Sequence, residues 1–256
     1  MRRARRHGLR RLFFMTLALA GAGMAASAAN ALPCMAIEMT AKPQDRAALL
    51  ADMKGAQNAL LARWQKAGLV TGYHLLFTRA SDDRVWDAMM LLTFADESTQ
   101  TRWRTQLSPG SGGIAPEALG HVLSVETTPC DSVRQGGPNT ATNPVALVVP
   151  YVALIPPTQY LEYLDGYTIP QFRGWVDEGV LDSYEVITSR FPAGRTWNAV
   201  IFLRYRDDAA LARRDEIVAK VRAGLSQSAT WKSFSDSKKA IRTEGRLAVA
   251  DYISDK

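Results

Sequence analysis

The sequence has few of the residues that metal and thiol sites require. Its 256 residues include two cysteines and three histidines, with no His-Glu-x-x-His and no Cys-x-x-Cys arrangement. These absences argue against a dedicated zinc site and a dithiol redox centre, and we predict no metal site. The Gly-x-Ser-x-Gly turn of hydrolases is also missing, and the glycine-rich stretch 109–113 lacks the Lys-Ser/Thr of a phosphate-binding loop.

Acidic residues are missing from the N-terminal part of the chain. No acid precedes Glu38, and six arginines lie within the first 11 residues. The formal charge of +6 comes from 31 basic and 25 acidic residues, so these six arginines account for all of it. The rest of the chain is balanced, which gives no support for nucleic acid or an anionic membrane as a partner.

The first 31 residues have the three parts of a secretory signal peptide. An arginine-rich start is followed by the apolar stretch 12–20 and by small residues, with an Ala-x-Ala cleavage site at 29–31 and a competing one at 26–28. Residues 10–14 resemble a twin-arginine export signal, and an arginine-rich general-secretion leader is the alternative. Nothing after residue 31 is apolar enough to span a bilayer. We expect a periplasmic or secreted protein.

Two segments of the chain resemble each other. Residues 64–97 and 175–208 align without a gap at a constant offset of 111. Nine aligned pairs are identical, against about two expected by chance. These pairs are Trp64/Trp175, Gly68/Gly179, Tyr73/Tyr184, Arg79/Arg190, Arg84/Arg195, Trp86/Trp197, Ala88/Ala199, Leu92/Leu203 and Asp96/Asp207. We interpret this similarity as an internal duplication.

Each copy predicts the same series of elements: a strand, a helix, a hairpin, a second helix and a last strand. In the first copy we expect the first strand at 34–41, the first helix at 45–67 and the hairpin strands at 70–79 and 84–95. The second helix is expected from Asp96 and the last strand at 121–128. In the second copy we expect the first strand at 145–154, the first helix at 157–178 and the hairpin strands at 181–190 and 195–206. The second helix is expected from Asp207 and the last strand at 246–253. Gly68 and Gly179 end the first helices, and Pro170 is expected to kink the second of them. Asp96 and Asp207 are suited to N-capping.

The βαββαβ order is that of the ferredoxin-like split motif, and it occurs twice. We divide the chain into a signal peptide at 1–31, a first repeat at 32–133, a polar linker at 134–144 and a second repeat at 145–256. This arrangement resembles the dimeric α/β-barrel superfamily, in which two ferredoxin-like units face each other sheet to sheet. The resemblance implies an α+β fold in which tandem repeats form a pseudo-dimer within one chain. Further oligomerisation is left open.

The two cysteines are expected to form a disulfide. In this topology the last strand of a repeat runs antiparallel beside the first, which places the start of one next to the end of the other. Cys34 and Cys130 lie at those two positions of the first repeat. An oxidising compartment would favour the bond, and the alternatives are two free thiols or an intermolecular bond.

The two faces of each hairpin have different residues. A four-residue turn would place Phe77 opposite Trp86, and the face they share is kept alike between the copies, so we expect it to pack against the helices. Trp86 and Trp197 are therefore interpreted as core residues of that helix-facing side. The paired arginines on this face are expected to cap a hairpin end or to bind a nearby carboxylate rather than a substrate. The opposite face has diverged, and in the barrel it would look into the interior.

The diverged face supplies the candidate site residues. We propose His74, Asp87 and Glu185 as candidate catalytic residues, with His74 as general base or axial haem ligand and Asp87 to orient its ring. In an enzyme, Asp87 or Glu185 would act with His74 as an acid/base group. Met89, Asn198 and Phe202 are the candidate ligand-binding residues. His121 is a weaker candidate. Haem, which needs one axial histidine, is the one cofactor considered.

Three functions are compatible with these residues. The first is an exported protein that binds a small apolar molecule in a cavity between the two sheets. The second is a cofactor-independent or haem-dependent enzyme resembling monooxygenases or isomerases, both of which the superfamily includes. The third is a structural or interaction module with a packed interior. The basic stretch made of Lys232, Lys238, Lys239, Arg242 and Arg246 is interpreted as a solvated helix face rather than an anion site.

Overall fold

The computed structural model describes residues 31–82, 85–107 and 110–255. The predicted signal peptide lies outside these ranges apart from its last residue, so it remains a prediction. Within the described residues, no helix is long and apolar enough to cross a membrane.

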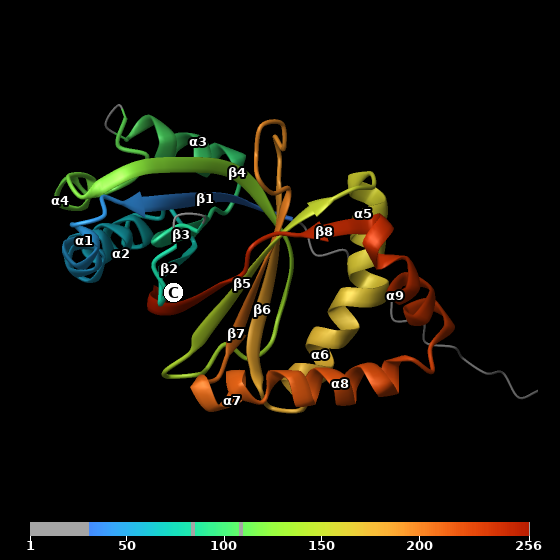
Figure 1. The fold of residues 1–256 in the computed structure, drawn as a ribbon. Helices are drawn as coiled ribbons and strands as arrows, with labels where there is room; N and C mark the ends of the chain where they lie inside the picture. The colour runs from blue at the N-terminus through green and yellow to red at the C-terminus, as the bar shows by residue number, and fades with distance from the viewer. Residues whose placement is uncertain (1–30, 83–84, 108–109, 256) are drawn as a thin grey trace, which may run out of the picture.

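Eight antiparallel strands close into a barrel (Figure 1). Their order around the barrel is β7-β6-β4-β1-β3-β2-β9-β5, and β5 pairs with β7 to close it. The strands are β1 (Leu32–Ala41), β2 (Gly72–Thr78), β3 (Ala88–Thr93), β4 (Val122–Gly136), β5 (Val145–Ala153), β6 (Leu181–Ser189), β7 (Ala199–Tyr205) and β9 (Ala248–Asp255). A short strand, β8 (Arg242–Glu244), pairs with the end of β5.

The two halves of the chain have the same strand order. The first half is ordered β4-β1-β3-β2 and the second β9-β5-β7-β6. The pairings β4–β6 and β2–β9 join the halves. In these pairings Arg79 binds Asp208 and Asp251 of the second half, while Arg190 binds Glu97 and Asp131 of the first. The expectation that these two arginines bind nearby carboxylates is confirmed.

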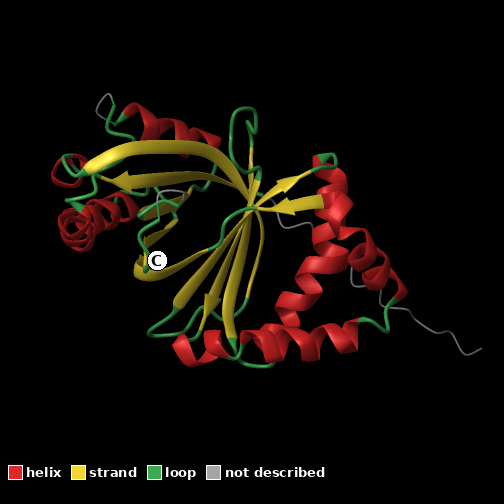
Figure 2. Cartoon of the chain, in the orientation of Figure 1, coloured by secondary structure: helices red, strands yellow, loops and turns green. Residues whose placement is uncertain are grey.

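The helices cover the outside of the barrel in two groups, one for each half (Figures 1 and 2). The first group contains α1 (Arg46–Asp52), η1 (Met53–Gln57), α2 (Asn58–Lys66), α3 (Glu97–Thr105) and α4 (Pro116–Leu119). The second contains α5 (Pro157–Tyr163), η2 (Leu164–Thr168), α6 (Ile169–Asp177), α7 (Asp208–Ala212), α8 (Arg214–Leu225) and α9 (Ala229–Ile241). Because their apolar sides lie on the sheet, the barrel has a core on each outer side as well as one inside.

The first helix of each half is continuous but contains a π-helical turn. The two turns, η1 and η2, lie 111 residues apart, which is the offset of the duplication. Pro170 follows η2 in the first turn of α6, yet η1 has no proline beside it. The proline therefore does not by itself explain the widened turn. Gly68 and Gly179 follow these helices with φ of 68° and 75°, a left-handed conformation that glycine adopts without strain.

The predicted N-caps of the second helices are confirmed. The Asp96 carboxylate accepts a hydrogen bond from Thr99 N, and the Asp207 carboxylate accepts one from Ala210 N, each at 2.7 Å. The hydrogen bonds to Thr99 and Ser98 lower the pKa of Asp96 to about 2. Both caps satisfy amides that a helix leaves unpaired in its first turn.

The hairpins differ from the prediction by two residues in register. Phe77 pairs with Ala88 rather than with Trp86, and β2 ends at Thr78, so the connection is longer than four residues. The expected four-residue turn was wrong because residues before β3 bind the neighbouring strand β1: Asp87 N donates to Met39 O. A shift of two residues keeps the alternation of faces, so Tyr73, Leu75, Phe77, Ala88, Met90 and Leu92 still pack under the helices.

The interpretation of Trp86 and Trp197 as helix-facing core residues was wrong. Both pack in the cluster inside the barrel, Trp197 buried and Trp86 half-buried. They precede β3 and β7, so the strand alternation that placed them on the outer face does not apply to them. The same inner cluster contains Ala36, Leu76, Leu91, Ile187 and Val200, which fill the middle of the barrel.

The disulfide between Cys34 and Cys130 is present, with a Cα–Cα distance of 4.8 Å, which confirms the predicted pairing. Cys34 and Cys130 are directly opposite each other on β1 and β4. A disulfide is compatible with an oxidising compartment. Beyond it, β4 continues to Gly136, three residues into the predicted linker, because Arg134, Gln135 and Gly136 pair with β6 of the second half.

Candidate functional site at one mouth of the barrel

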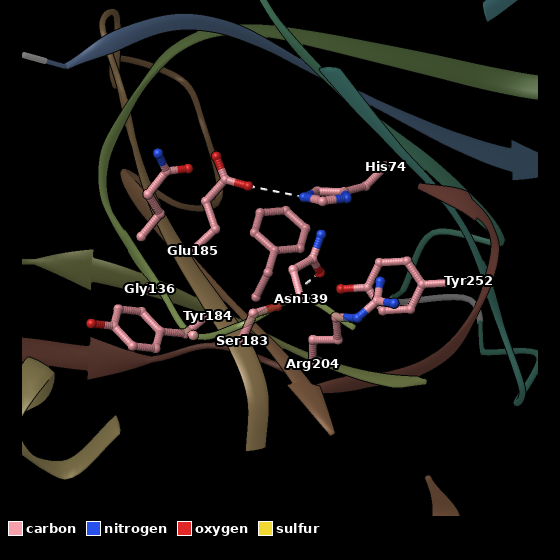
Figure 3. A pocket seen from close by; sticks show the side chains of 11 residues that line it. His74, Gly136, Asn139, Ser183, Tyr184, Glu185, Arg204 and Tyr252 are labelled. Atoms are coloured by element: carbon pink, nitrogen blue, oxygen red, sulfur yellow. Dashed lines mark hydrogen bonds and ion pairs between the residues drawn. The ribbon is translucent and has the colours of Figure 1, made fainter. Parts of the chain in front are cut away.

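Two predicted catalytic residues meet inside one mouth of the barrel. His74 on β2 and Glu185 on β6 face each other, and His74 Nε2 lies 3.0 Å from Glu185 Oε2 (Figure 3). The two residues are 111 apart, so they occupy equivalent positions in the two copies. The site thus exists only because the halves close into one barrel.

The Glu185 carboxylate is held on both oxygens. Its Oε1 accepts a hydrogen bond of 2.5 Å from Ser132 Oγ on β4, while Oε2 contacts His74. Burial acts to raise the pKa of Glu185, but the hydrogen bonds and charge of His74 and the hydrogen bond of Ser132 outweigh it and lower the pKa. Glu185 is therefore ionised, and an ionised carboxylate requires a donor at His74 Nε2.

The second ring nitrogen of His74 is in a different situation. Nδ1 is buried and has no hydrogen-bond partner in the part of the chain that the structure describes. The imidazole ring packs edge-on against Tyr252, at 5.7 Å between centroids, and lies 6.3 Å from Phe202. With Nε2–H donated to Glu185, a neutral His74 carries its lone pair on Nδ1.

A cavity of about 340 Å³ lies over this pair (Figure 3). Its lining includes Arg204, which is buried and forms an ion pair with Asp182: Arg204 Nε donates to Asp182 Oδ2 at 2.8 Å. The Arg204 guanidinium also lies over the Tyr252 ring, 4.8 Å from its centroid. The lining residues are His74, Gln135, Gly136, Gly137, Asn139, Ser183, Tyr184, Glu185, Phe202, Arg204 and Tyr252. The volume suits a small molecule with polar groups.

The structure brings only some of the predicted site residues together. Phe202 lines the cavity with His74 and Glu185. Asp87, just before β3, and Asn198, just before β7, do not line this cavity. Asp87 binds Arg46 and accepts from Ala41 N, and Asn198 accepts from Ala153 N and donates to Ala153 O. The expectation that Asp87 orients the His74 ring was therefore wrong, because Glu185 holds that position.

Met89 lies at the opposite mouth of the barrel, in a second cavity of about 220 Å³. The two tryptophans Trp86 and Trp197 line it, and Trp197 Nε1 donates to Glu38 Oε1 at 2.7 Å. Burial raises the pKa of Glu38 to about 7, and the nearby Glu126 adds to this rise. The sequence reasoning missed Glu38, Ser132 and Tyr252, which lie on β1, β4 and β9, because only the hairpins were assigned inner and outer faces.

His121, the weaker candidate, does not line the cavity with His74. Its Nδ1 is 3.4 Å from Asp45 and its Nε2 is 3.5 Å from Asp52, next to the first helix. Within the described residues, no group of three or more His, Cys, Asp and Glu side chains could hold a metal ion.

The described histidines do not fit an axial haem ligand. Nε2 of His74 is taken by Glu185, and both nitrogens of His121 face carboxylates. Ligation through Nε2 of His74 or through His121 would break these contacts, so we derive no step through haem.

No protein-family model and no curated protein sequence matches the chain. Solved structures do share its fold. A putative monooxygenase from Lactobacillus acidophilus matches with a TM-score of 0.55 and 9% identity, and the match covers 88% of this chain and 95% of that chain. A putative monooxygenase from Fusobacterium nucleatum matches with a TM-score of 0.54 and 11% identity, and the match covers 89% of this chain and 95% of that chain. An anthrone oxidase-like protein matches with a TM-score of 0.52, 11% identity, and 88% of this chain and 92% of that chain covered. The chain has the dimeric α/β-barrel fold of the suspected superfamily.

Proposed function

We propose that this chain is an exported enzyme that catalyses proton transfer on a small molecule bound over the His74–Glu185 pair. We also propose that its halves are tandem ferredoxin-like repeats that arose by duplication. The observation that carries the function is the partly buried contact of 3.0 Å between His74 Nε2 and Glu185 Oε2 on the wall of a cavity. A fold alone does not determine function, so the chemistry of this site carries the proposal.

In the proposed reaction His74 is the base and Glu185 positions it. Glu185 keeps the proton on Nε2, which leaves the lone pair on Nδ1. Nδ1 is buried in the structure, so the reaction requires the side chains that cover it to move aside when the substrate binds. The substrate then loses a proton from an acidic C–H or O–H to Nδ1 and becomes an anion, while His74 becomes an imidazolium. The ionised Glu185 stabilises that imidazolium, as the carboxylate of a catalytic triad does. Proton return to a different substrate atom would complete an isomerisation.

The lining favours this enzyme over a binder of apolar molecules. The middle of the barrel is filled by apolar side chains, so the space between the sheets is reduced to cavities at its mouths. The cavity with His74 carries Arg204, Asn139, Ser183 and Tyr252 and suits a polar substrate. The putative monooxygenases among the structural neighbours are compatible with an enzyme. In that form of the reaction dioxygen would oxidise the substrate carbanion, so that a CH2 group becomes a ketone, with one oxygen atom in the product and the other released as water.

Export is part of the proposal. It is supported by the arginine-rich, apolar and small-residue parts of the leader and by the disulfide, which persists in an oxidising compartment. Exported protein collected from a periplasmic fraction should have an N-terminus near residue 32 and no free thiol.

Proton transfer can be tested without knowing the product. The wild-type protein would be incubated in D2O with small 2-oxo acids, lactones and hydroquinones, and deuterium uptake at carbon followed by NMR. We expect His74→Asn to slow the exchange by about 100-fold or more and Glu185→Gln by about tenfold. His121→Asn is the matched histidine control and should leave the rate unchanged.

Several results would contradict the proposal. Exchange at the wild-type rate in His74→Asn would remove His74 as the base, and no exchange with any compound of the panel would reject this substrate class. Dioxygen consumption that depends on His74 would select the monooxygenase-like form. A Soret band that appears on haem addition and disappears in His74→Asn would favour the haem-dependent alternative.

A further inference from the structure

The outer core of the second half contains buried polar atoms without partners. Trp175 Nε1, Thr168 Oγ1, Arg214 Nε and Arg242 Nη1 are buried, and none has a hydrogen-bond partner among the described residues. All four residues line one small cavity of about 70 Å³ between the helices and the outer face of the sheet. Leaving a buried polar group unpaired costs about 1–3 kcal/mol, so four around one cavity require an explanation.

The chemistry of these atoms specifies what would satisfy them. The indole N–H of Trp175 and the guanidinium N–H groups of Arg214 and Arg242 can only donate hydrogen bonds. A group that only accepts is therefore complementary to them, and a carboxylate is such a group. Three arginines, Arg214, Arg222 and Arg242, line the cavity together with one acid, Glu244, so its charge also favours an anion.

Arg242 is placed for such a role. It follows α9, and its guanidinium lies 3.7 Å from the centroid of the Tyr151 ring and 5.5 Å from that of Tyr163. Stacking on two rings fixes the plane of the guanidinium while leaving its edge for a ligand. Nearby, the buried Tyr160 hydroxyl faces Arg242. Burial raises the pKa of Tyr160 to about 12 and Arg242 opposes this rise, so this phenol stays neutral.

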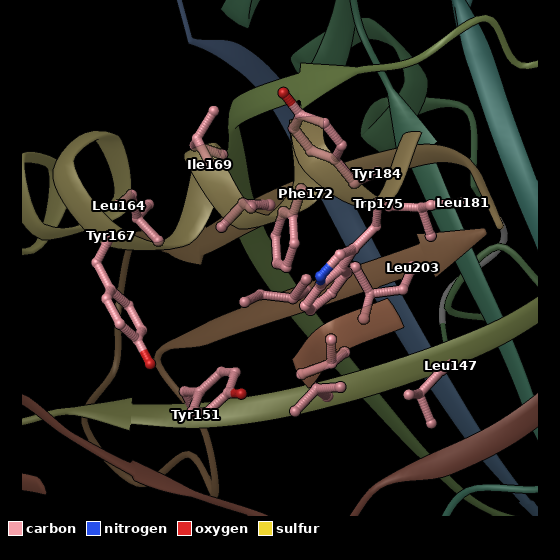
Figure 4. Packing of buried hydrophobic residues seen from close by; sticks show 14 of the residues in the cluster. Leu147, Tyr151, Leu164, Tyr167, Ile169, Phe172, Trp175, Leu181, Tyr184 and Leu203 are labelled. Atoms are coloured by element: carbon pink, nitrogen blue, oxygen red, sulfur yellow. The ribbon is translucent and has the colours of Figure 1, made fainter. Parts of the chain in front are cut away.

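The surrounding surface is suited to an apolar molecule. Phe172, Trp175, Ile201 and Leu203 line the same cavity, and Figure 4 shows Phe172 and Trp175 of α6 packed over the sheet near Tyr151. A larger cavity of about 520 Å³ shares Tyr151, Arg222, Arg242 and Glu244 with the small one. Lys238 and Lys239 line this larger cavity, which adds positive charge. Together the two cavities provide space for a carboxylate and for the body attached to it.

The first half shows that the fold does not require these polar groups. Leu49 and Phe94 occupy the positions that Tyr160 and Tyr205 occupy in the second half, at the offset of 111. Two of the arginines come from α8, a helix of 12 residues, whereas the first half has α3 with 9 residues and α4 with 4. These polar groups therefore belong to the second half and not to the scaffold that both halves share.

We propose that the second half binds a small carboxylic acid with a planar apolar body between its helices and the outer face of the sheet. The carboxylate accepts from Arg242, Arg214 and Trp175 in the small cavity. The planar body extends from Phe172 into the larger cavity, along the rings of Tyr151 and Tyr167. Arg242 is therefore a binding residue rather than part of a solvated basic face. This site is on the outside of the barrel and is independent of the His74–Glu185 pair.

Isothermal titration calorimetry with 2-naphthoate as the probe tests the proposal, and 2-naphthamide serves as its neutral isostere. We expect naphthoate to bind at one site of the full chain and naphthamide at least tenfold more weakly. Arg242→Gln should weaken naphthoate binding at least tenfold and leave naphthamide unchanged. Arg213→Gln is the matched control, because Arg213 is an exposed arginine next to α8 that lines neither cavity.

A second variant keeps the test decisive if Arg242→Gln does not fold. Trp175→Phe removes one N–H and keeps an aromatic ring, and it should weaken naphthoate binding about threefold while the protein still melts cooperatively. Equal binding of naphthoate and naphthamide, or naphthoate binding that survives both variants, would overturn the proposal. Inorganic phosphate that binds as tightly as naphthoate would overturn it too, because the apolar body would then contribute nothing. Loss of naphthoate binding only in His74→Asn would place the probe in the barrel mouth instead.

Discussion

The two halves of the chain share a scaffold and differ in what they bury. Both have the same strand order, a π-helical turn at the same position and an Asp N-cap on the second helix. Both outer cores are mainly aliphatic, but the buried cluster of the first half contains methionines and one tyrosine, whereas that of the second half contains six tyrosines and no methionine. The features kept in both halves define the barrel, and the features that diverged provide the candidate sites.

The inner face shows the same division. The barrel centre is apolar in both halves, but the equivalent positions His74 and Glu185 carry opposite chemistry and meet across it. A symmetric pair of two histidines or two glutamates would repel when both are charged. The difference between the two halves therefore allows an ion-pairing contact that two identical side chains could not form.

The largest expected effect comes from the disulfide, which only the first half has. Cys34 and Cys130 correspond to Ala146 and Ala250, which are buried and directly opposite each other on β5 and β9. The bond spans 96 residues, so replacing both cysteines by alanine should lower the free energy of unfolding by about 4–5 kcal/mol. Thermal unfolding should show a melting temperature lower by about 10 °C or more.

The reverse change tests the equivalence of the two positions. Ala146→Cys together with Ala250→Cys should form a second disulfide, detected as no free thiol, and should raise the melting temperature. A double alanine variant that melts at the wild-type temperature would contradict the expected stabilisation.

The second largest effect concerns a buried ion pair that only the second half has. Arg204 and Asp182 are both buried, and their equivalents in the first half are Thr93 and Thr71. Asp182→Ala would leave a buried guanidinium without its carboxylate, which should cost about 3–5 kcal/mol in urea unfolding. Replacing both residues by threonine copies the first half and should recover most of the loss. If the double variant is no more stable than Asp182→Ala, the halves are not interchangeable here.

The third prediction concerns the pH dependence of stability that comes from Glu38, which lines the cavity at the other mouth of the barrel. The residue equivalent to Glu38 in the second half is Pro150, which has no charge. Burial raises the Glu38 pKa to about 7 from 4.5 in the unfolded chain, so the folded protein binds more protons between these values. Its stability should therefore fall as pH rises from about 4.5 to 7, by about 3 kcal/mol from this residue. The free energy of unfolding of Glu38→Gln should lack this decrease. Parallel pH profiles of the two proteins would contradict the prediction.

The smallest effect compares the two π-helical turns. Gln57 donates to Gly113 O at 3.2 Å and accepts from Ala115 N at 2.7 Å, while the equivalent Thr168 has a buried hydroxyl without a partner in the described chain. Gln57→Leu should destabilise by about 1–3 kcal/mol because it leaves backbone groups unpaired. Thr168→Val should change the stability by less than about 1 kcal/mol. Denaturant unfolding of both variants measures the contrast, and equal losses would reject it.

Local features of the fold could be predicted from the sequence. Apolar periodicity indicated the long helices, Gly68 and Gly179 marked their ends, and Asp96 and Asp207 marked the next helix starts. The split βαββαβ order placed Cys34 beside Cys130. Each of these depends on contacts within a few residues or on the order of elements, which a sequence displays directly.

The site could be predicted only in part. The alternation of the strands placed His74, Glu185 and Phe202 on the inner face, but the choice of Asp87 as the partner of His74 was based on a hairpin register that does not form. The long turn is set by hydrogen bonds to β1, and no pattern in the hairpin itself reveals them. Ser132 and Tyr252 were missed for the same reason, since they reach the site from other strands.

The sequence by itself indicated two similar segments, the elements around each of them, the disulfide and the charge balance of the chain after its arginine-rich start. Only the tertiary structure decided that His74 meets Glu185, that the tryptophans turn inward and that Arg242 stacks on Tyr151 and Tyr163. Periodicity and capping are local and leave a record along the chain. Closure of the barrel brings together positions 111 residues apart, and which side chains meet there depends on register and packing across both halves.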